Sequence, residues 1–388
     1  MRSKKVFIGL IIVIVAITGI FLFFRGSEDI SNTNSDNASG QKTVNTADNI
    51  IRIAAAGDFL PHDSVNLNAQ TQNGYDYRQF FEPIKTELDG ADIVFCNQES
   101  PSAPNLSVSG FPVFNAPREF AADLSETGCN VISVANNHLF DKGQEGINGT
   151  RRVWDDLDAL AVSGANRSQS EQDKVSYFEV EGVRFAFVAF TEISNQDPAF
   201  PFSLNFLKED LVRKLISEAE NNADLVIVSA HWGTEYSPDV NKNQEEWSQT
   251  FTNLGADLIF GHGPHVIQPV NRLEGPGGNQ AVVFYSLGNL LSTQLDIESL
   301  TGGLALIDVD KNTKKFKSAT FYPTYMHYEW TAQEKAAEDL LKRKNLKIYP
   351  LSTASEQMEG SHHQTTSREQ VKRIAGILNK YIGIDVKN

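Results

Sequence analysis

The feature that most constrains the fold of this chain is a series of short, uninterrupted apolar runs that alternate with amphipathic stretches. Continuous apolar runs suit strands that are buried on both faces of a sheet. Several of the stretches between them have helical spacing of apolar residues and end at Gly or Asn, as at 120–128, 209–223 and 245–255. Strand–helix alternation favours an α/β fold with a largely parallel sheet. The runs occupy residues 50–56, 91–96, 130–135, 183–190, 224–230, 257–260, 281–287 and 303–309, and the last strands, 281–287, 303–309 and 316–322, are expected to be antiparallel.

The first 25 residues form a separate segment. Basic residues Arg2, Lys4 and Lys5 precede residues 6–24, a span of 19 residues without charge. About 20 apolar residues cross a bilayer as a helix, and the basic end is expected to stay in the cytoplasm. A cleaved signal peptide is the alternative, although its apolar core is usually shorter. We therefore expect a single-pass membrane anchor, with the main domain outside the cytoplasm.

Composition divides the remaining chain into three parts. Residues 26–49 are rich in Ser, Asn and Asp and hold too little apolar surface to offset ordering, so we expect a flexible tether. Residues 50–330 contain the alternating runs and are expected to form the main domain. Residues 331–388 contain two helix-like stretches and are expected to form a C-terminal helical extension.

The net charge and the cysteines indicate which class of partner is excluded and which cellular compartment is expected. The formal net charge of −15 argues against a nucleic-acid partner, because phosphate binding needs clustered Lys and Arg. The two cysteines could pair in an oxidising compartment. Cys96, however, ends one apolar run and Cys129 begins the next. In neighbouring parallel strands their sulfurs would lie near opposite ends of the sheet, so we expect two free thiols.

Polar and ionisable residues directly follow six of the apolar runs. In parallel α/β sheets ligands bind at the carboxyl ends of the strands, so these residues are expected to meet although they are far apart in sequence. An ordinary turn explains each of them alone, but their joint placement favours a site. Five of the eight histidines belong to the set. It comprises Asp58, His62, Asn97, Glu99, Asn137, His138, Asp141, His231, Glu235, His262, His265 and Asn289.

This combination of side chains is typical of divalent-metal chemistry. Imidazole with carboxylate and amide oxygens suits Zn, Mn or Fe(II), and no thiolate belongs to the set. Because there are more candidate ligands than one tetrahedral ion needs, the sequence predicts two ions, about 3.5–4 Å apart. Such a pair activates water and stabilises charge on a phosphoryl oxygen, while a nearby histidine protonates the leaving oxygen.

The motifs together resemble those of the CapA family of capsule and poly-γ-glutamate biosynthesis proteins, within the calcineurin-like metallophosphoesterase superfamily. The resemblance covers residues 51–290 and implies a four-layer α/β sandwich with its site at the sheet edge. It rests on GDFL (57–60), NQES (97–100), ANNHLFDKG (135–143), HWGTEY (231–236), GHGPHVIQPV (261–270) and YSLGNLL (285–291).

The resemblance also implies the metal ligands. Asp58 corresponds to a ligand of the first metal, and Glu99 takes the place of the superfamily's bridging aspartate. Asn137 and His231 correspond to ligands of the second metal. The superfamily usually begins Asp-x-His, but this chain has Leu60 at the third position, and His62 is the expected substitute. The closing element supplies His262 and His265, here separated by two residues instead of one, which favours His265 as the ligand.

Four further residues are expected to act on substrate. His138 corresponds to the catalytic histidine, and Asp141 is expected to orient it or its loop. Glu235 and Asn289 are expected to contact substrate.

The function implied is that of a membrane-anchored, extracytoplasmic protein of capsule or poly-γ-glutamate synthesis or export with a divalent-metal hydrolase site. Two alternatives remain open. One is a non-catalytic accessory or polymer-binding subunit with a structural metal, and the other is a general metal-dependent phosphoesterase unrelated to capsule. The expected partners are the membrane, membrane proteins of a polymer synthase, and an anionic polymer or phosphoester substrate.

Overall fold

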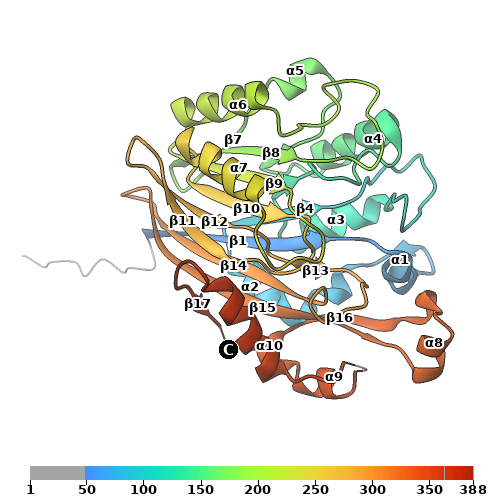
Figure 1. Cartoon of the computed structure of the whole chain (residues 1–388). Helices are drawn as coiled ribbons and strands as arrows, with labels where there is room; N and C mark the ends of the chain where they lie inside the picture. The colour runs from blue at the N-terminus through green and yellow to red at the C-terminus, as the bar shows by residue number, and fades with distance from the viewer. Residues whose placement is uncertain (1–48, 362, 388) are drawn as a thin grey trace, which may run out of the picture. The chain divides into compact units, whose positions relative to one another are not determined.

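The computed structural model describes residues 49–361 and 363–387 (Figure 1). The expected anchor, and the expected tether except for Asn49, lie outside these residues. Within the part that is described, no helix combines the length and apolarity needed to cross a bilayer.

The larger sheet is built around β1 (Ile50–Phe59), whose residues from Ile53 onward are buried. Its parallel half holds the predicted runs at 50–56, 91–96 and 130–135 and a further short strand at 161–163 that was not predicted, and its antiparallel half holds later strands of the chain. The order is β16 (Lys344–Pro350), β15 (Lys315–Glu329), β14 (Thr301–Asp310), β1, β4 (Ile93–Gln98), β5 (Val131–Ser133) and β6 (Ala161–Ser163), while β13 (Asn289–Leu291) pairs with the end of β1 and β17 (Asp385–Val386) with β15.

The second sheet has four parallel strands between two antiparallel edge strands. Its central strands are apolar and buried on both faces, as the continuous runs in the sequence predict. The order is β11 (Val270–Glu274), β12 (Gln280–Phe284), β10 (Leu258–His262), β9 (Leu225–His231), β8 (Val183–Thr191) and β7 (Ser176–Val180), and a small hairpin of β2 (Gln70–Thr71) and β3 (Gly74–Tyr75) stands apart.

The two sheets pack against each other through a shared apolar core. Phe95 on β4 lies 5.0 Å from Phe260 on β10 and 5.8 Å from Phe187 on β8, measured between ring centroids. These contacts join one sheet to the other, because β4 belongs to the larger sheet and the other two strands to the smaller one. The chain is therefore a mixed α/β protein with two packed sheets, as the alternation of runs predicts.

Helices cover the outer faces of the two sheets. The helices α6 (Glu209–Asn222) and α7 (Lys242–Asn253) pack on the second sheet in one cluster, and α10 (Ser367–Leu378) lies on the opposite side of the sheets (Figure 1). The others are α1 (Asp63–Ala69), α2 (Lys85–Asp89), α3 (Arg118–Glu126), α4 (Gly143–Asp156), α5 (Gln169–Gln172), α8 (Ala332–Ala336) and α9 (Ser355–Glu359).

The C-terminal segment is more than the helical extension that its composition predicts. Besides α8, α9 and α10, residues 331–388 supply β16 and β17, which both extend the larger sheet. In β16 the buried side chains of Leu346 and Ile348 alternate with more exposed ones, the two-residue period of a strand. This period spans only a few residues, and pairing with β15 decides its structure.

The prediction of two free thiols is wrong, because Cys96 and Cys129 form a disulfide with their Cα atoms 5.8 Å apart. The error lay in the register of the two strands. Phe95 pairs with Val131, so Cys96 lies opposite Ile132, only three residues along from Cys129. The strand β5 is also shorter than the apolar run, and Cys129 lies in the turn that follows α3, from which its sulfur reaches back to β4.

Candidate metal centre

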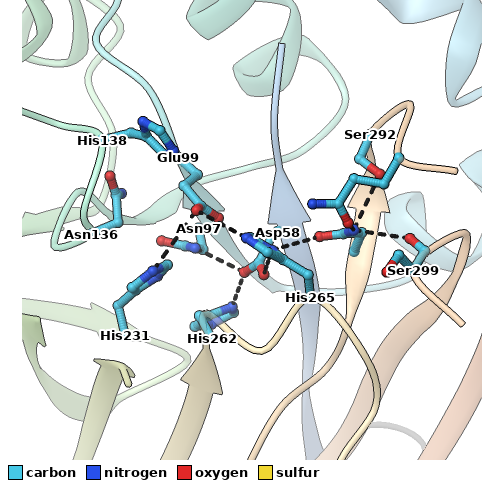
Figure 2. Close-up of polar contacts among 12 residues, drawn as sticks. Asp58, Asn97, Glu99, Asn136, His138, His231, His262, His265, Ser292 and Ser299 are labelled. Carbon is cyan, nitrogen blue, oxygen red and sulfur yellow. Dashed lines mark hydrogen bonds and ion pairs between the residues drawn. The ribbon is translucent and has the colours of Figure 1, made fainter. Parts of the chain in front are cut away.

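The carboxyl ends of strands from both sheets meet at one place. In the larger sheet, Asp58 is in register with Asn97 on β4 and with Asn289 on β13. In the second sheet, His231 at the end of β9 is in register with His262 at the end of β10. Figure 2 shows these side chains converging from the two sheets. Register thus brings together residues that lie up to about 230 positions apart, from Asp58 to Asn289.

Asp58 is the hub of the cluster and is fully buried. Its Oδ1 accepts a hydrogen bond from the Asn97 side-chain amide at 2.9 Å and lies 2.7 Å from Nδ1 of His262. Its Oδ2 lies 3.1 Å from Nδ1 of His265 (Figure 2). The same Nδ1 is 3.1 Å from the side-chain oxygen of Asn289. One carboxylate therefore fixes two histidines from a different sheet.

Glu99 lies beside this hub and is also fully buried. Its Oε1 is 3.8 Å from Nε2 of His231 and 3.7 Å from Nε2 of His265. Asp58, Glu99 and His265 each present a ligand atom, and these atoms all lie within 4.8 Å of one another. That spacing is what one cation needs to contact all three.

Several buried polar atoms around Glu99 have no hydrogen-bond partner among the described residues. Both carboxylate oxygens of Glu99 are in this state, and so are ring nitrogens of two histidines. Most buried polar atoms in proteins are paired, because an unpaired one is costly. These atoms are lone-pair donors that suit a divalent cation, so the residues present fit a metal site. The unpaired atoms are Asn97 Oδ1, Glu99 Oε1 and Oε2, Asn136 Oδ1, Asn137 Oδ1, His231 Nδ1 and His262 Nε2.

Burial and neighbouring charges shift the pKa values of the buried residues in the cluster in different directions. Burial raises the pKa of Glu99 well above its usual value and lowers the pKa of His231 to about 3. Burial also opposes ionisation of Asp58, but hydrogen bonds from His262 and His265 hold its pKa well below the usual range. Burial opposes the charge on His265 too, yet Glu99 and Asp58 raise its pKa to about 9. The cluster thus favours a positive charge next to its carboxylates.

The turn that follows β10 and contains Gly263 and His265 has unusual backbone dihedral angles. Gly263 has a φ of +104°, and a Cβ there would lie 2.7 Å from the backbone oxygen of Trp232. His265 itself has a φ of 59°, which is uncommon for a residue with a side chain. Strained backbone of this kind persists where the surrounding structure imposes it, often at functional sites. Here it turns the His265 ring toward Asp58 and Glu99 (Figure 2).

His138 belongs to a second, neighbouring network. Its Nδ1 lies 2.8 Å from Oδ2 of Asp141, which also accepts a hydrogen bond from the backbone N–H of Phe114 at 2.8 Å. The Phe114 ring packs edge-on against the imidazole at 4.6 Å, and the Asn195 side-chain amide lies 3.2 Å from Nδ1. Asp141 therefore orients the His138 ring through the Nδ1 atom.

The remaining candidate residues fall in three places. Asn137 is buried, and its side-chain oxygen is unpaired among the described residues. Asn289 is held by Ser292, Gln294 and Ser299 within the cluster, where it contacts His265. His62 and Glu235 line an adjacent cavity, and Nδ1 of His62 accepts a hydrogen bond from the Thr293 N–H at 3.3 Å. The hydrogen bond of His62 with Thr293 and its ring contact with Phe114 thus lie outside the Asp58–Glu99–His265 group.

That cavity has a volume of about 660 Å³ and reaches the cluster through His138 and His265. Its far wall comes from residues 338–341 and Arg343, which belong to the C-terminal segment. A cavity of this size suits a small molecule or one end of a longer one. The cluster is therefore buried but adjoins space that a ligand can occupy.

Asn97 was among the polar residues expected at the strand ends, without an assigned role, and it donates a hydrogen bond to Asp58. Sequence reasoning did not select two further residues that the structure brings to the site. Asn195 and Arg343 lie in irregular segments without such a signal, so only tertiary contacts reveal them.

The fold and the cluster define a class: a two-sheet α/β protein with a buried carboxylate–histidine group suited to metal at the carboxyl ends of its strands. Residues 52–294 match the family described as "Bacterial capsule synthesis protein PGA_cap". The chain belongs to this family.

Two Bacillus proteins named for PGA or capsule biosynthesis are similar to this chain. The chain is similar to the "PGA biosynthesis protein CapA" of Bacillus subtilis (strain 168), with 29% identity over 89% of this chain and 86% of that protein. It is also similar to the "Capsule biosynthesis protein CapA" of Bacillus anthracis, with 31% identity over 57% of this chain and 56% of that protein.

Similarity to solved structures is weaker. A phosphatase from Mycoplasma pneumoniae aligns with a TM-score of 0.44 and 17% identity, over 71% of this chain and 93% of that one. A 5'-nucleotidase from Candida albicans SC5314 aligns with a TM-score of 0.38 and 11% identity, over 68% of this chain and 52% of that one.

Proposed function

We propose that this protein is a divalent-metal-dependent phosphoesterase-type hydrolase that works outside the cytoplasm in capsule or poly-γ-glutamate synthesis or export. The observation that carries the proposal is the Asp58–Glu99–His265 group, with buried lone-pair atoms around it that have no protein partner among the described residues. Its position beside a cavity that also contains His138 gives a substrate access to both. Membership of the capsule synthesis family supplies the biological setting.

The residues divide the work between binding a metal and moving a proton. Asp58, Glu99 and His265 would hold a first ion, and the unpaired atoms of Asn137, His231 and His262 suit a second. Divalent ions at such a site activate water and neutralise charge on a phosphoryl oxygen. In hydrolysis the oxygen of water forms a bond to phosphorus and loses a proton to solvent, while the ester P–O bond breaks and the leaving oxygen takes a proton. His138, oriented by Asp141 at the cavity, is positioned to donate it.

The extracytoplasmic location is supported by two independent features. The apolar span at residues 6–24 follows basic residues. The Cys96–Cys129 disulfide favours an oxidising compartment, because cytosolic thiols are kept reduced. Protease added to intact cells should remove the domain. If the domain is protected until the membrane is opened, with access to its outer face verified, the proposed orientation is wrong.

The decisive experiment on the reaction uses the full chain in detergent. Its metal content is measured by elemental analysis, and hydrolysis of an aryl phosphate diester is followed before and after chelation. We expect one or two divalent ions per chain and hydrolysis that is lost with chelator and restored by Mn or Zn. Absence of bound metal after loading with these ions contradicts the proposed metal site.

A non-catalytic role is the second candidate, and the depth of the cluster favours it, since Asp58, Glu99 and His262 are fully buried. A structural metal would stabilise the packing of the two sheets without chemistry. In that case chelation lowers the unfolding temperature, and no phosphoester is hydrolysed at any metal loading.

A further inference from the structure

The cavity beside the metal centre has an unusually apolar rim. Single exposed apolar residues are ordinary on protein surfaces, but a contiguous group of them marks a binding site. Among the described residues, twelve large apolar side chains are exposed, and five of these line this one cavity. They are Phe111 (66% exposed), Tyr236 (56%), Leu341 (55%), Leu295 (45%) and Leu340 (43%).

The inner end of the same cavity has the opposite character. His138 and His265 face it from the metal side, and the buried Arg343 adds a permanent positive charge to its wall. Nε of Arg343 donates a hydrogen bond to the Leu340 carbonyl at 2.7 Å. The Arg343 carbonyl accepts one from the Asn68 side chain at 2.8 Å. The first bond ties the guanidinium to the short 3₁₀ helix Leu340–Lys342, which also carries the two leucines of the rim.

The charge along the walls argues against a polyanion in this cavity. Five carboxylates line it, at Asp63, Glu235, Asp296, Glu338 and Asp339. A chain of carboxylates would meet these like charges along its length. A ligand with one anionic group at the inner end and an apolar remainder meets complementary surfaces at both ends.

We propose that the cavity binds an amphiphilic phosphoester, with its phosphoryl head at the His138–His265 end and its alkyl or prenyl part on the rim formed by Phe111, Tyr236, Leu295, Leu340 and Leu341. This inference rests on the proposed function and names its substrate class. Three of these five rim residues lie beyond residues 52–294, the part that matches the capsule synthesis family. Most of the apolar rim therefore comes from this chain's later segment, while Phe111 and Tyr236 belong to the part that matches the family.

The test compares methyl and octyl p-nitrophenyl phosphate as substrates of the full, metal-loaded chain. Each fully buried methylene is worth roughly a fourfold gain in affinity, and partial burial on the rim should give the octyl ester a kcat/KM roughly 30-fold higher. The Leu340→Ser/Leu341→Ser double variant should lose roughly tenfold of this preference, mainly through a lower kcat/KM for the octyl ester. Leu160→Ser, at an exposed leucine away from the cavity, is the matched control and should keep the full preference.

A binding measurement separates this inference from the proposed reaction. Octyl phosphate and methyl phosphate are titrated by calorimetry into the wild-type chain and the double variant, with unchanged unfolding temperatures verifying that the variants are folded. Tighter binding of octyl phosphate that the double variant loses supports the inference even if no ester is hydrolysed, in which case only the proposed reaction fails. Equal binding of the two phosphates overturns the inference. Displacement of octyl phosphate by poly-γ-glutamate as effectively as by more octyl phosphate also overturns it, because the cavity would then accept a polyanion.

Discussion

Asp58 and His262 join the two sheets of the protein through a contact of 2.7 Å between Oδ1 and Nδ1. Asp58 ends the central strand of the larger sheet, and His262 ends β10 of the smaller one. Both are fully buried, so the contact is shielded from water and from screening by salt. The candidate metal centre is therefore also a point at which the sandwich is held together, and loss of its ligands should affect both metal content and stability.

His231→Ala tests this coupling. The change removes a buried imidazole 3.8 Å from Glu99 and should lower metal affinity by about 100-fold or more, since even indirect partners of a metal contribute 10–100-fold. Because bound metal contributes folding free energy, the unfolding temperature should fall as well. Elemental analysis and thermal unfolding measure the two effects. His363→Ala, outside the cluster, is the control, and an unchanged metal content in His231→Ala would exclude His231 as a ligand.

His138→Ala should separate catalysis from metal binding. Among the described residues, His138 forms hydrogen bonds with Asp141 and Asn195 and a ring contact with Phe114, and none with the Asp58–Glu99–His265 group, so metal content should stay nearly intact. The hydrolytic rate should fall by roughly 10²–10⁴-fold, the usual contribution of a general acid.

Asp141→Asn serves as the companion variant. Its side-chain oxygen can still accept a hydrogen bond from the Phe114 N–H, but the carboxylate that orients the His138 ring is replaced by a neutral amide, so the rate should fall less than in His138→Ala. The double variant should be no slower than His138→Ala alone, because Asp141 acts through His138. A silent His138→Ala together with a damaging His231→Ala would instead indicate a structural metal.

Removal of the disulfide should destabilise the domain. The bridge closes a loop over a sequence separation of 33 residues, which corresponds to about 3–4 kcal/mol from restriction of the unfolded chain. Urea unfolding of the Cys96→Ser/Cys129→Ser variant should show this loss in the free energy of unfolding. Thiol labelling of the unfolded, non-reduced wild-type protein should detect no free group, and two labelled thiols would show that the bridge is absent.

The buried carboxyl of Asp257 should lower the free energy of unfolding as pH rises, which is opposite to the effect of a carboxyl with a lowered pKa. Burial raises its pKa from the usual 3.8 to about 6, although its Oδ2 accepts a hydrogen bond from the Val226 N–H. A carboxyl whose pKa is higher in the folded state favours folding when protonated, so its contribution is greatest below about pH 4 and is lost as pH rises through about 6. Asp257→Asn should remove this dependence and raise the unfolding temperature at pH 7 relative to wild type.

Asp224→Asn is the comparison with the opposite sign. A hydrogen bond from Lys314 lowers the pKa of Asp224, so its contribution is lost as pH falls. Thermal unfolding between pH 2 and pH 8 measures both variants, because the Asp224 contribution is lost only below its usual pKa of 3.8. If Asp257→Asn leaves the slope of stability against pH unchanged, the buried carboxyl does not titrate in this range.

Local sequence determined much of this protein. Apolar runs at residues 50–56, 224–230 and 257–260 became buried strands, because a two-sided apolar segment is stable only inside a sheet sandwich. The polar residues that follow them were predicted to converge, because parallel strands end at one edge. Asp58, Glu99 and His265 do meet there.

Tertiary structure alone decided the rest. The register between β4 and β5 brought Cys96 to Cys129, and register is set by packing between strands and not by either segment alone. Pairing with β15 turned residues 344–350 into a strand. The same pairing carried Arg343 to the cavity from a segment with no motif of its own, because long-range contacts depend on the whole folded chain and leave no local pattern.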